Sequence, residues 1–187
     1  IIDSQLNFEE HMLHISKKVS NKLSALGRIS NFMTFEGRRR LFKAFIESQF
    51  NYCPLIWMQH SRALNNKINR IHERALRLVY SNYELPFKEL LKIDNSFSIH
   101  HRNIQYLAIE VYKFLNGLSP EIMSIVFQVQ NKSYNLRSNN IFYSKNPKTV
   151  RYGTETITYL APKIWSSIPE DIKSSNTLGI FKEKMQH

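Results

Sequence analysis

Four cationic residues between Leu64 and Tyr80 have the spacing that contacts to a phosphodiester backbone would need. They recur every three or four positions, which aligns them on one side of a helix: Lys67, Arg70, Arg74 and Arg77. An apolar series of the same kind lies one position away and predicts a face packed on a core: Leu64, Ile68, Ile71, Ala75 and Leu78. A row of cations on a rigid helix suits a line of phosphates. The alternative is a solvated face, which charged runs commonly form.

Further cations lie on the two helices that we expect before this one. Lys17, Lys18 and Lys22 fall on the polar side of the first, and Arg38, Arg39 and Arg40 begin the second. Cations at a helix N-terminus oppose the helix dipole, so a role other than helix stability is indicated. We therefore predict one nucleic-acid-binding surface on the N-terminal half, made from Lys17, Lys18, Lys22, Arg38, Arg39, Arg40, Lys67, Arg70, Arg74 and Arg77.

Other chemistry finds little support in the sequence. The histidine pairs, His11 with His14 and His100 with His101, have no acidic residue at a metalloprotease spacing and no cysteine group beside them, so we expect no metal site. Aspartates are few and scattered, which leaves no paired carboxylates for two magnesium ions. Cys53 lies among aromatic and aliphatic residues, and we expect it in the core. We predict no catalytic residue.

The composition fits an intracellular protein with a polyanionic partner. The 187 residues include 26 Lys and Arg against 15 Asp and Glu, a formal charge of +11, and one cysteine. Charge is concentrated at the two ends: residues 1–80 carry +7, residues 81–130 carry −1, and residues 131–187 carry +5. No apolar run is long enough for a membrane span. We expect a nuclear or cytoplasmic protein without a membrane partner, and, because it starts at Ile1, a fragment.

Periodicity predicts a mainly α fold. Three long helices should form a bundle: Phe8 to Met33, with Gly27 as a local weak point; Glu36 to Cys53, with Leu41, Phe42, Phe45 and Ile46 inward and Pro54 kinking or ending it; and Arg62 to Tyr80. Shorter helices follow up to residue 130. Asn131 to Lys148 is predicted to be loop, Thr149 to Leu160 one or two short strands, and the remainder two short helices.

The segment "SQFNYCPLIWMQHSRALNNKINRIHERALRLVY" resembles the stretch after the palm in LINE-type (non-LTR) retrotransposon reverse transcriptases. Further segments match the same family in order: "IIDSQLNFEEHM", "SKKVSNKLSALGRI", "SIHHRNIQYLAIEVYKFLNGLSPEIM", "YNLRS" and "YGTETITYLAPKIWSSIPEDIK". The resemblance implies the end of the palm and a helical thumb over residues 1–80, a helical connector over 81–130, and a loop with a small strand–helix linker region over 131–187.

The resemblance also implies a function. The chain would be the thumb and linker segment of an RNA-directed DNA polymerase, with an RNA template, RNA/DNA or DNA duplex, and the upstream palm and fingers as partners. The family's Asp-Asp motif is absent here, so we expect no activity from this chain alone and no cofactor, with magnesium only on the missing palm. The alternative is a free-standing helical module that binds RNA or protein without polymerising.

Overall fold

The computed structural model describes residues 8–58, 62–129, 142, 147–149, 153 and 156–185, and for Arg62 only the backbone. The chain divides into two compact units, Ile1–Asn103 and Ile104–His187. The division falls inside helix α7, so the predicted connector is shared between the units. Each unit has buried residues of its own and is described separately.

Helix α1, Glu9–Ile29, forms one wall of the first core. Glu9 and Glu10 put negative charge at its N-terminal end, where the helix dipole favours it. Its buried residues recur at the spacing of a helical face: Met12, Ile15, Ser16, Val19, Leu23 and Leu26. A short 3-10 turn, Ser30–Phe32, follows the helix.

The second helical run consists of three consecutive pieces: α2, Phe35–Leu41; the π-helical segment η2, Phe42–Glu47; and α3, Ser48–Phe50. The side chain of Thr34 caps α2 by accepting a hydrogen bond from the Gly37 amide at 3.2 Å. The prediction that Phe45 points inward is wrong, since 52% of it is exposed. The wider π turns keep Phe42, Ile46 and Phe50 on the core side and rotate Phe45 outward.

Pro54 does not kink this run, which ends at Phe50. It occupies the first position of a new helix, α4, Pro54–Trp57, where its missing amide costs no helical hydrogen bond. Trp57 is buried, and its indole nitrogen donates to the Tyr52 carbonyl at 2.8 Å. A buried indole with its polar atom satisfied is core structure.

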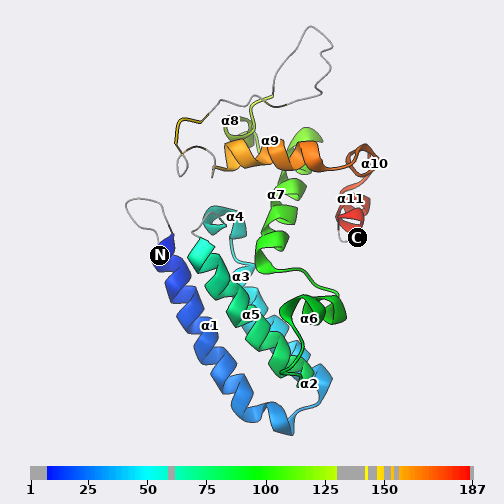
Figure 1. The fold of residues 1–187 in the computed structure, drawn as a ribbon. Helices are drawn as coiled ribbons and strands as arrows, with labels where there is room; N and C mark the ends of the chain where they lie inside the picture. Colours follow the sequence, from blue (N-terminus) through cyan, green and yellow to red (C-terminus); the bar gives the residue numbers. More distant parts are fainter. Residues whose placement is uncertain are drawn as a thin grey trace. The chain divides into compact units, whose positions relative to one another are not determined.

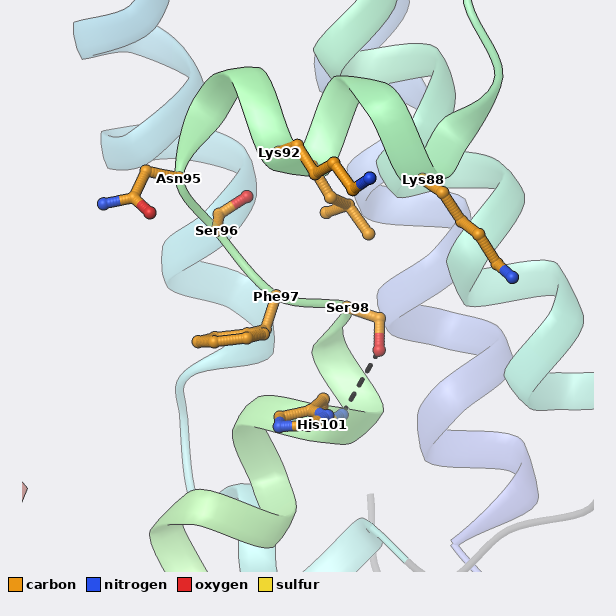
Figure 2. A pocket seen from close by; sticks show the side chains of 8 residues that line it. Lys88, Lys92, Asn95, Ser96, Phe97, Ser98 and His101 are labelled. Carbon is orange, nitrogen blue, oxygen red and sulfur yellow. Dashed lines mark hydrogen bonds between the residues drawn. The ribbon is translucent and has the colours of Figure 1, made fainter. Parts of the chain in front are cut away.

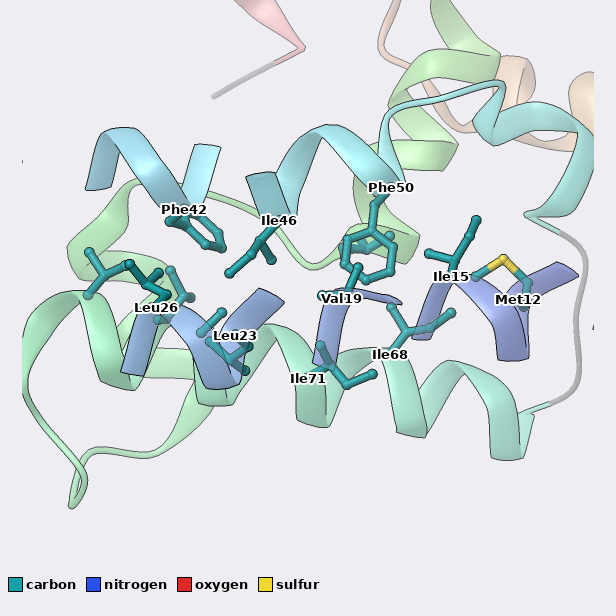
Figure 3. Close-up of a cluster of buried hydrophobic side chains, with 14 of the residues drawn as sticks. Met12, Ile15, Val19, Leu23, Leu26, Phe42, Ile46, Phe50, Ile68 and Ile71 are labelled. Atoms are coloured by element: carbon teal, nitrogen blue, oxygen red, sulfur yellow. The ribbon is translucent and has the colours of Figure 1, made fainter. Parts of the chain in front are cut away.

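Helix α5, Arg62–Tyr80, completes the predicted three-helix bundle, and Figure 3 shows its Ile68 and Ile71 packed against Val19 and Leu23 of α1. The two helices approach closely at Gly27, where an added Cβ would lie 3.3 Å from Leu78 Cδ1. Figure 1 shows that α1 and α5 run in the same direction and that α2 runs opposite to both. The bundle therefore rests on the apolar series found in the sequence.

Two more helices follow α5. Helix α6, Phe87–Asp94, buries Leu90, and helix α7, Ile99–Leu115, begins with the buried Ile99. Asn95 ends α6 in the left-handed conformation at φ 50°, which asparagine tolerates better than most residues. The turn between the two helices is therefore short and sharply bent.

The described residues of the second unit form the remainder of α7 and four short helices: α8, Met123–Val126; α9, Ile157–Ser167; α10, Glu170–Lys173; and α11, Leu178–Lys184. Its core is aromatic: the rings of Tyr112 and Phe181 stack at 4.3 Å, and Trp165 stacks on Phe181 at 6.1 Å. The Tyr112 hydroxyl donates to the Ser175 carbonyl at 2.6 Å. These contacts hold α11 and the turn before it on α7.

The predicted strand of the C-terminal region needs correction, and where two terminal helices were predicted the described residues form three, α9, α10 and α11. Ile157 to Leu160, predicted as extended, form the first turn of α9. The β-branched and aromatic residues of this stretch favour strands. However, Ala161 and Trp165, which lie one helical turn apart, are both buried, and such tertiary packing overrides strand propensity. Extended pairing in the part that the structure describes is a single bridge, Val129 with Phe142, so the mixed α/β region is not found there. Ile1 to Asn7 and most of Asn131 to Thr156 lie outside the described residues.

Candidate nucleic-acid interface

Helix α5 carries three exposed cations on the side away from its core. Lys67, Arg70 and Arg74 are exposed, whereas Ile68, Ile71 and Ala75 beside them are buried. Within the described ranges none of the three cations forms an ion pair. Their charges therefore face solvent on a helix whose other face is fixed in the bundle.

Lys17 of α1 is also exposed. Because α1 and α5 run in the same direction, counting ten residues back from the Gly27–Leu78 contact pairs the level of Lys17 with that of Ile68. At about 100° per residue, Lys17 lies on the exposed flank of α1 beside α5, whereas Lys18 lies on the side opposite Gly27. We call Lys17, Lys67, Arg70 and Arg74 the α1–α5 cationic face.

Arg77, predicted in the same exposed row, is only partly exposed and has protein partners. Its guanidinium forms an ion pair with Glu73 one turn back, at 2.7 Å, and donates to the Leu85 carbonyl at 3.4 Å. An ion pair at this spacing supports the helix itself. Arg77 thus holds the segment after α5 in place and is not one of the exposed, unpaired cations of this helix.

The three arginines predicted to begin the second helix lie in the last turn of α2, and their surroundings differ from one another. Arg38 donates to the carbonyls of Val79 at 3.1 Å and Ser30 at 3.4 Å, close to the C-terminal ends of α5 and α1. Helix C-termini favour cations, so the ends of α5 and α1 stabilise the charge of Arg38. Arg39 lies 3.4 Å from the carboxylate of the buried Asp94, and Arg40 is exposed.

The Arg39–Asp94 pair also includes Tyr80, whose hydroxyl donates to Asp94 at 2.8 Å. Burial, with the hydrogen bond to Asp94 second, raises the pKa of Tyr80 to about 12. Because Asp94 ends α6 and Tyr80 ends α5, this cluster ties the two helix ends together. It is a structural contact and contains no free cation for a ligand.

Lys22 belongs to a different surface. Its ammonium lies 5.7 Å from the centre of the exposed Phe45 ring, within range of a cation–π contact. Both residues line an apolar groove of about 230 Å³ between α1 and η2, together with Ile29 and Leu41. The ten predicted residues therefore have different surroundings, and the structure places Lys67, Arg70 and Arg74 on one exposed side of α5.

Cys53 and His72 differ in their exposure to solvent. Contrary to prediction, Cys53 is exposed, because the chain turns there with a left-handed φ of 45° and Trp57 takes the buried position. His72 is a core residue between the rings of Phe42 and Phe87. In the part of the chain that the structure describes, no three His, Cys, Asp or Glu residues are placed to hold a metal ion.

A second cationic site, not found from the sequence, lies at the junction of α6 and α7 (Figure 2). Lys88 and Lys92 line one side of a cavity of about 470 Å³, and Phe97 and His101 line another. The near-neutral charge of residues 81–130 concealed it, because the five acidic residues of this segment, Glu89 of the same helix among them, offset its four cations in the count. The available signal was the four-residue spacing of Lys88 and Lys92 on a short amphipathic helix.

No helix in the described ranges is both long and apolar enough to cross a bilayer. Comparison of the chain with models of known families, with curated proteins and with solved structures gave no match.

Proposed function

We propose that this chain is the thumb and linker segment of an RNA-directed DNA polymerase of a non-LTR retrotransposon, and that it grips the template–primer duplex through the α1–α5 cationic face. The observation that carries the proposal is the row Lys67, Arg70 and Arg74, exposed and unpaired within the described residues on the outer side of a packed bundle. The ordered sequence resemblance supplies the polymerase. The proposed partners are the RNA template, the duplex, and the upstream palm and fingers.

The dimensions of the row support backbone contact. Lys67 and Arg74 are two helical turns apart, a rise of about 10 Å, which corresponds to about three base-pair steps along one strand. Lys and Arg on such a line reach phosphates, whereas sequence reading needs side chains directed at base edges. Hybrid and A-form duplexes are held mainly by shape and backbone, so low sequence selectivity is expected.

The proposed function is tested by neutralising two cations of the row. Arg70→Gln with Arg74→Gln should weaken binding to unrelated hybrid duplexes by similar factors. If both residues contact phosphate, the slope of log K against log salt should flatten by about 1.8 for B-form and about 1.4 for single-strand-like sites, at roughly 0.9 and 0.7 per contact. Stability should change by no more than about 0.5 kcal/mol, because both side chains are exposed.

A matched control is available on the second helical run. Arg40→Gln with Lys43→Gln removes the same charge from two exposed positions outside the α1–α5 cationic face. This control should retain most of the affinity and salt slope. Equal losses in the two double variants would mean that net charge, and no particular surface, governs binding.

A free-standing helical module that binds RNA or protein without polymerising is the second candidate. The first unit favours it, because α1, α5 and the helices between them close a core of their own. The reading frame upstream of Ile1 distinguishes the two. An in-frame palm with the Asp-Asp motif supports the polymerase segment, and a start codon close to Ile1 supports the module.

A further inference from the structure

We infer that the cavity at the α6–α7 junction is a binding site for one unpaired nucleotide, either free or within a single strand. The site is separate from the α1–α5 cationic face, and the inference does not depend on duplex binding there. The cavity, about 470 Å³, lies within the size range of small-ligand sites. All of its walls belong to the first unit.

The charge of the cavity points to an anion. Lys88 and Lys92 lie one helical turn apart on the same face of α6, both exposed and, among the described residues, without an ion pair. None of the residues that line the cavity is acidic. The nearby Asp94 is buried and engaged by Tyr80 and Arg39, so it does not neutralise the lysines.

Hydroxyl groups add donors beside the lysines. The Oγ of Ser96 is buried and has no hydrogen-bond partner among the described residues, which is costly unless something else satisfies it. The Oγ of Ser98 accepts a hydrogen bond from the His101 amide at 3.3 Å, drawn as the dashed line in Figure 2. The Ser98 hydroxyl therefore keeps its own proton to donate to a ligand. The partial positive charge at the start of α7 acts in the same direction.

The aromatic wall of the cavity indicates a ligand that contains a planar base as well as a phosphate. The rings of Phe97 and His101 stack at 4.6 Å with an interplanar angle of 13°, and both line the cavity. Figure 2 shows these two rings across the cavity from the helix that carries Lys88 and Lys92. A simple anion gains little from an aromatic wall, whereas a nucleobase stacks on one in any sequence. Cations on one side and rings on the other match the phosphate and base of a nucleotide.

An unpaired base is required because the cavity receives its ligand between helices. In a duplex the bases are stacked and paired, so only a free nucleotide or a single strand can place a base against Phe97. Within the proposed polymerase segment, such a site would hold the template outside the duplex. Binding of a mononucleotide and binding of a strand are therefore the two sources to separate.

The experiment measures binding of a fluorescein-labelled oligouridine strand and of an abasic strand of the same length to the full 187-residue chain. Phe97→Leu keeps the site apolar and should weaken the base-bearing strand about five- to one-hundred-fold while leaving the abasic strand unchanged. Lys88→Gln with Lys92→Gln should weaken both strands and flatten the salt slope by roughly 1.4, about 0.7 per contact. Competition by uridine monophosphate at low concentration would identify a free nucleotide as the ligand, and its failure would identify the strand.

Two controls protect the result. Arg70→Gln with Arg74→Gln should leave the effect of Phe97→Leu intact, which separates this site from the duplex face. The wild-type chain should also photocross-link a 4-thiouridine strand to Phe97 or His101, a readout that needs no variant to fold. Cross-links confined to α1 and α5, unchanged affinity in Phe97→Leu and in the double lysine variant, or equal losses with the two strands in Phe97→Leu would overturn the inference.

Discussion

His72 should make the stability of the bundle depend on pH between about 7 and 5. It is 3% exposed and stacks on Phe42 with a centroid distance of 6.0 Å, while Phe87 meets it edge-on at 5.4 Å. Its Nδ1 is buried without a hydrogen-bond partner in the described part of the chain. Burial, with the nearby charge of Arg102 second, lowers the pKa of His72 from 6.5 to about 3.

The sign of the effect follows from which state binds the proton. Between pH 6.5 and 3 the unfolded chain takes up a proton at His72 and the folded chain does not. Stability is therefore fully present above pH 6.5 and is lost as pH falls toward 3. For this pKa difference, lowering the pH from 7 to 5 should cost about 2 kcal/mol. Most carboxylates titrate below pH 5, so this window isolates histidine.

Urea unfolding of wild type and His72→Leu at pH 7 and pH 5 measures the effect. Leucine removes the titrating group and the unpaired nitrogen, so the variant should lose about 2 kcal/mol less than wild type over this range. The control His14→Leu changes an exposed histidine and should behave as wild type. If wild type and His72→Leu lose the same stability, or if the wild-type His72 ring titrates by NMR between pH 7 and 5, the reasoning is refuted.

Two further predictions concern the turn between α3 and α4. Trp57→Ala should cost about 3–5 kcal/mol in urea unfolding, because the indole is 1% exposed; unchanged stability with weakened nucleic-acid binding would make Trp57 an exposed stacking residue instead. The exposed Cys53 thiol should react fully with a thiol reagent in the native protein, and Cys53→Gly should stabilise the fold by up to about 1 kcal/mol because φ is 45°. A thiol that reacts only after denaturant is added would contradict the observed exposure.

The apolar spacing of the first unit was readable from the sequence because one physical rule governs it. Residues such as Val19 and Ile68 recur at the helical period, and burying such a series is the main gain of helix packing. The same rule fails where the helix changes its winding. Phe45 fits a regular helical series, but the π turns of η2 move it outward.

The sequence does not show which cations bind other parts of the protein and which stay exposed, because these contacts join segments that are distant in sequence. Arg38 reaches the Val79 carbonyl, which is 41 residues away, and Arg39 reaches Asp94. Before folding, nothing distinguishes these arginines from Arg40, which stays exposed. The sequence therefore shows where cations lie along the chain, whereas contacts made on folding, such as those at helix ends, decide which cations remain available to a ligand.

Gly27 connects the packing of the bundle to the spacing of its surface charges. From the sequence, it counts only as a weak point of α1. In the structure it is the place where α1 and α5 come together, and Leu78 occupies the space that a Cβ would need to share. A larger residue there would move α1 away from α5, and Lys17 would move with it. The distance between Lys17 on α1 and the cations on α5 therefore depends on a contact in the core, one helical turn beyond Arg74, so the geometry of the cationic face is set by the residues that pack beneath it.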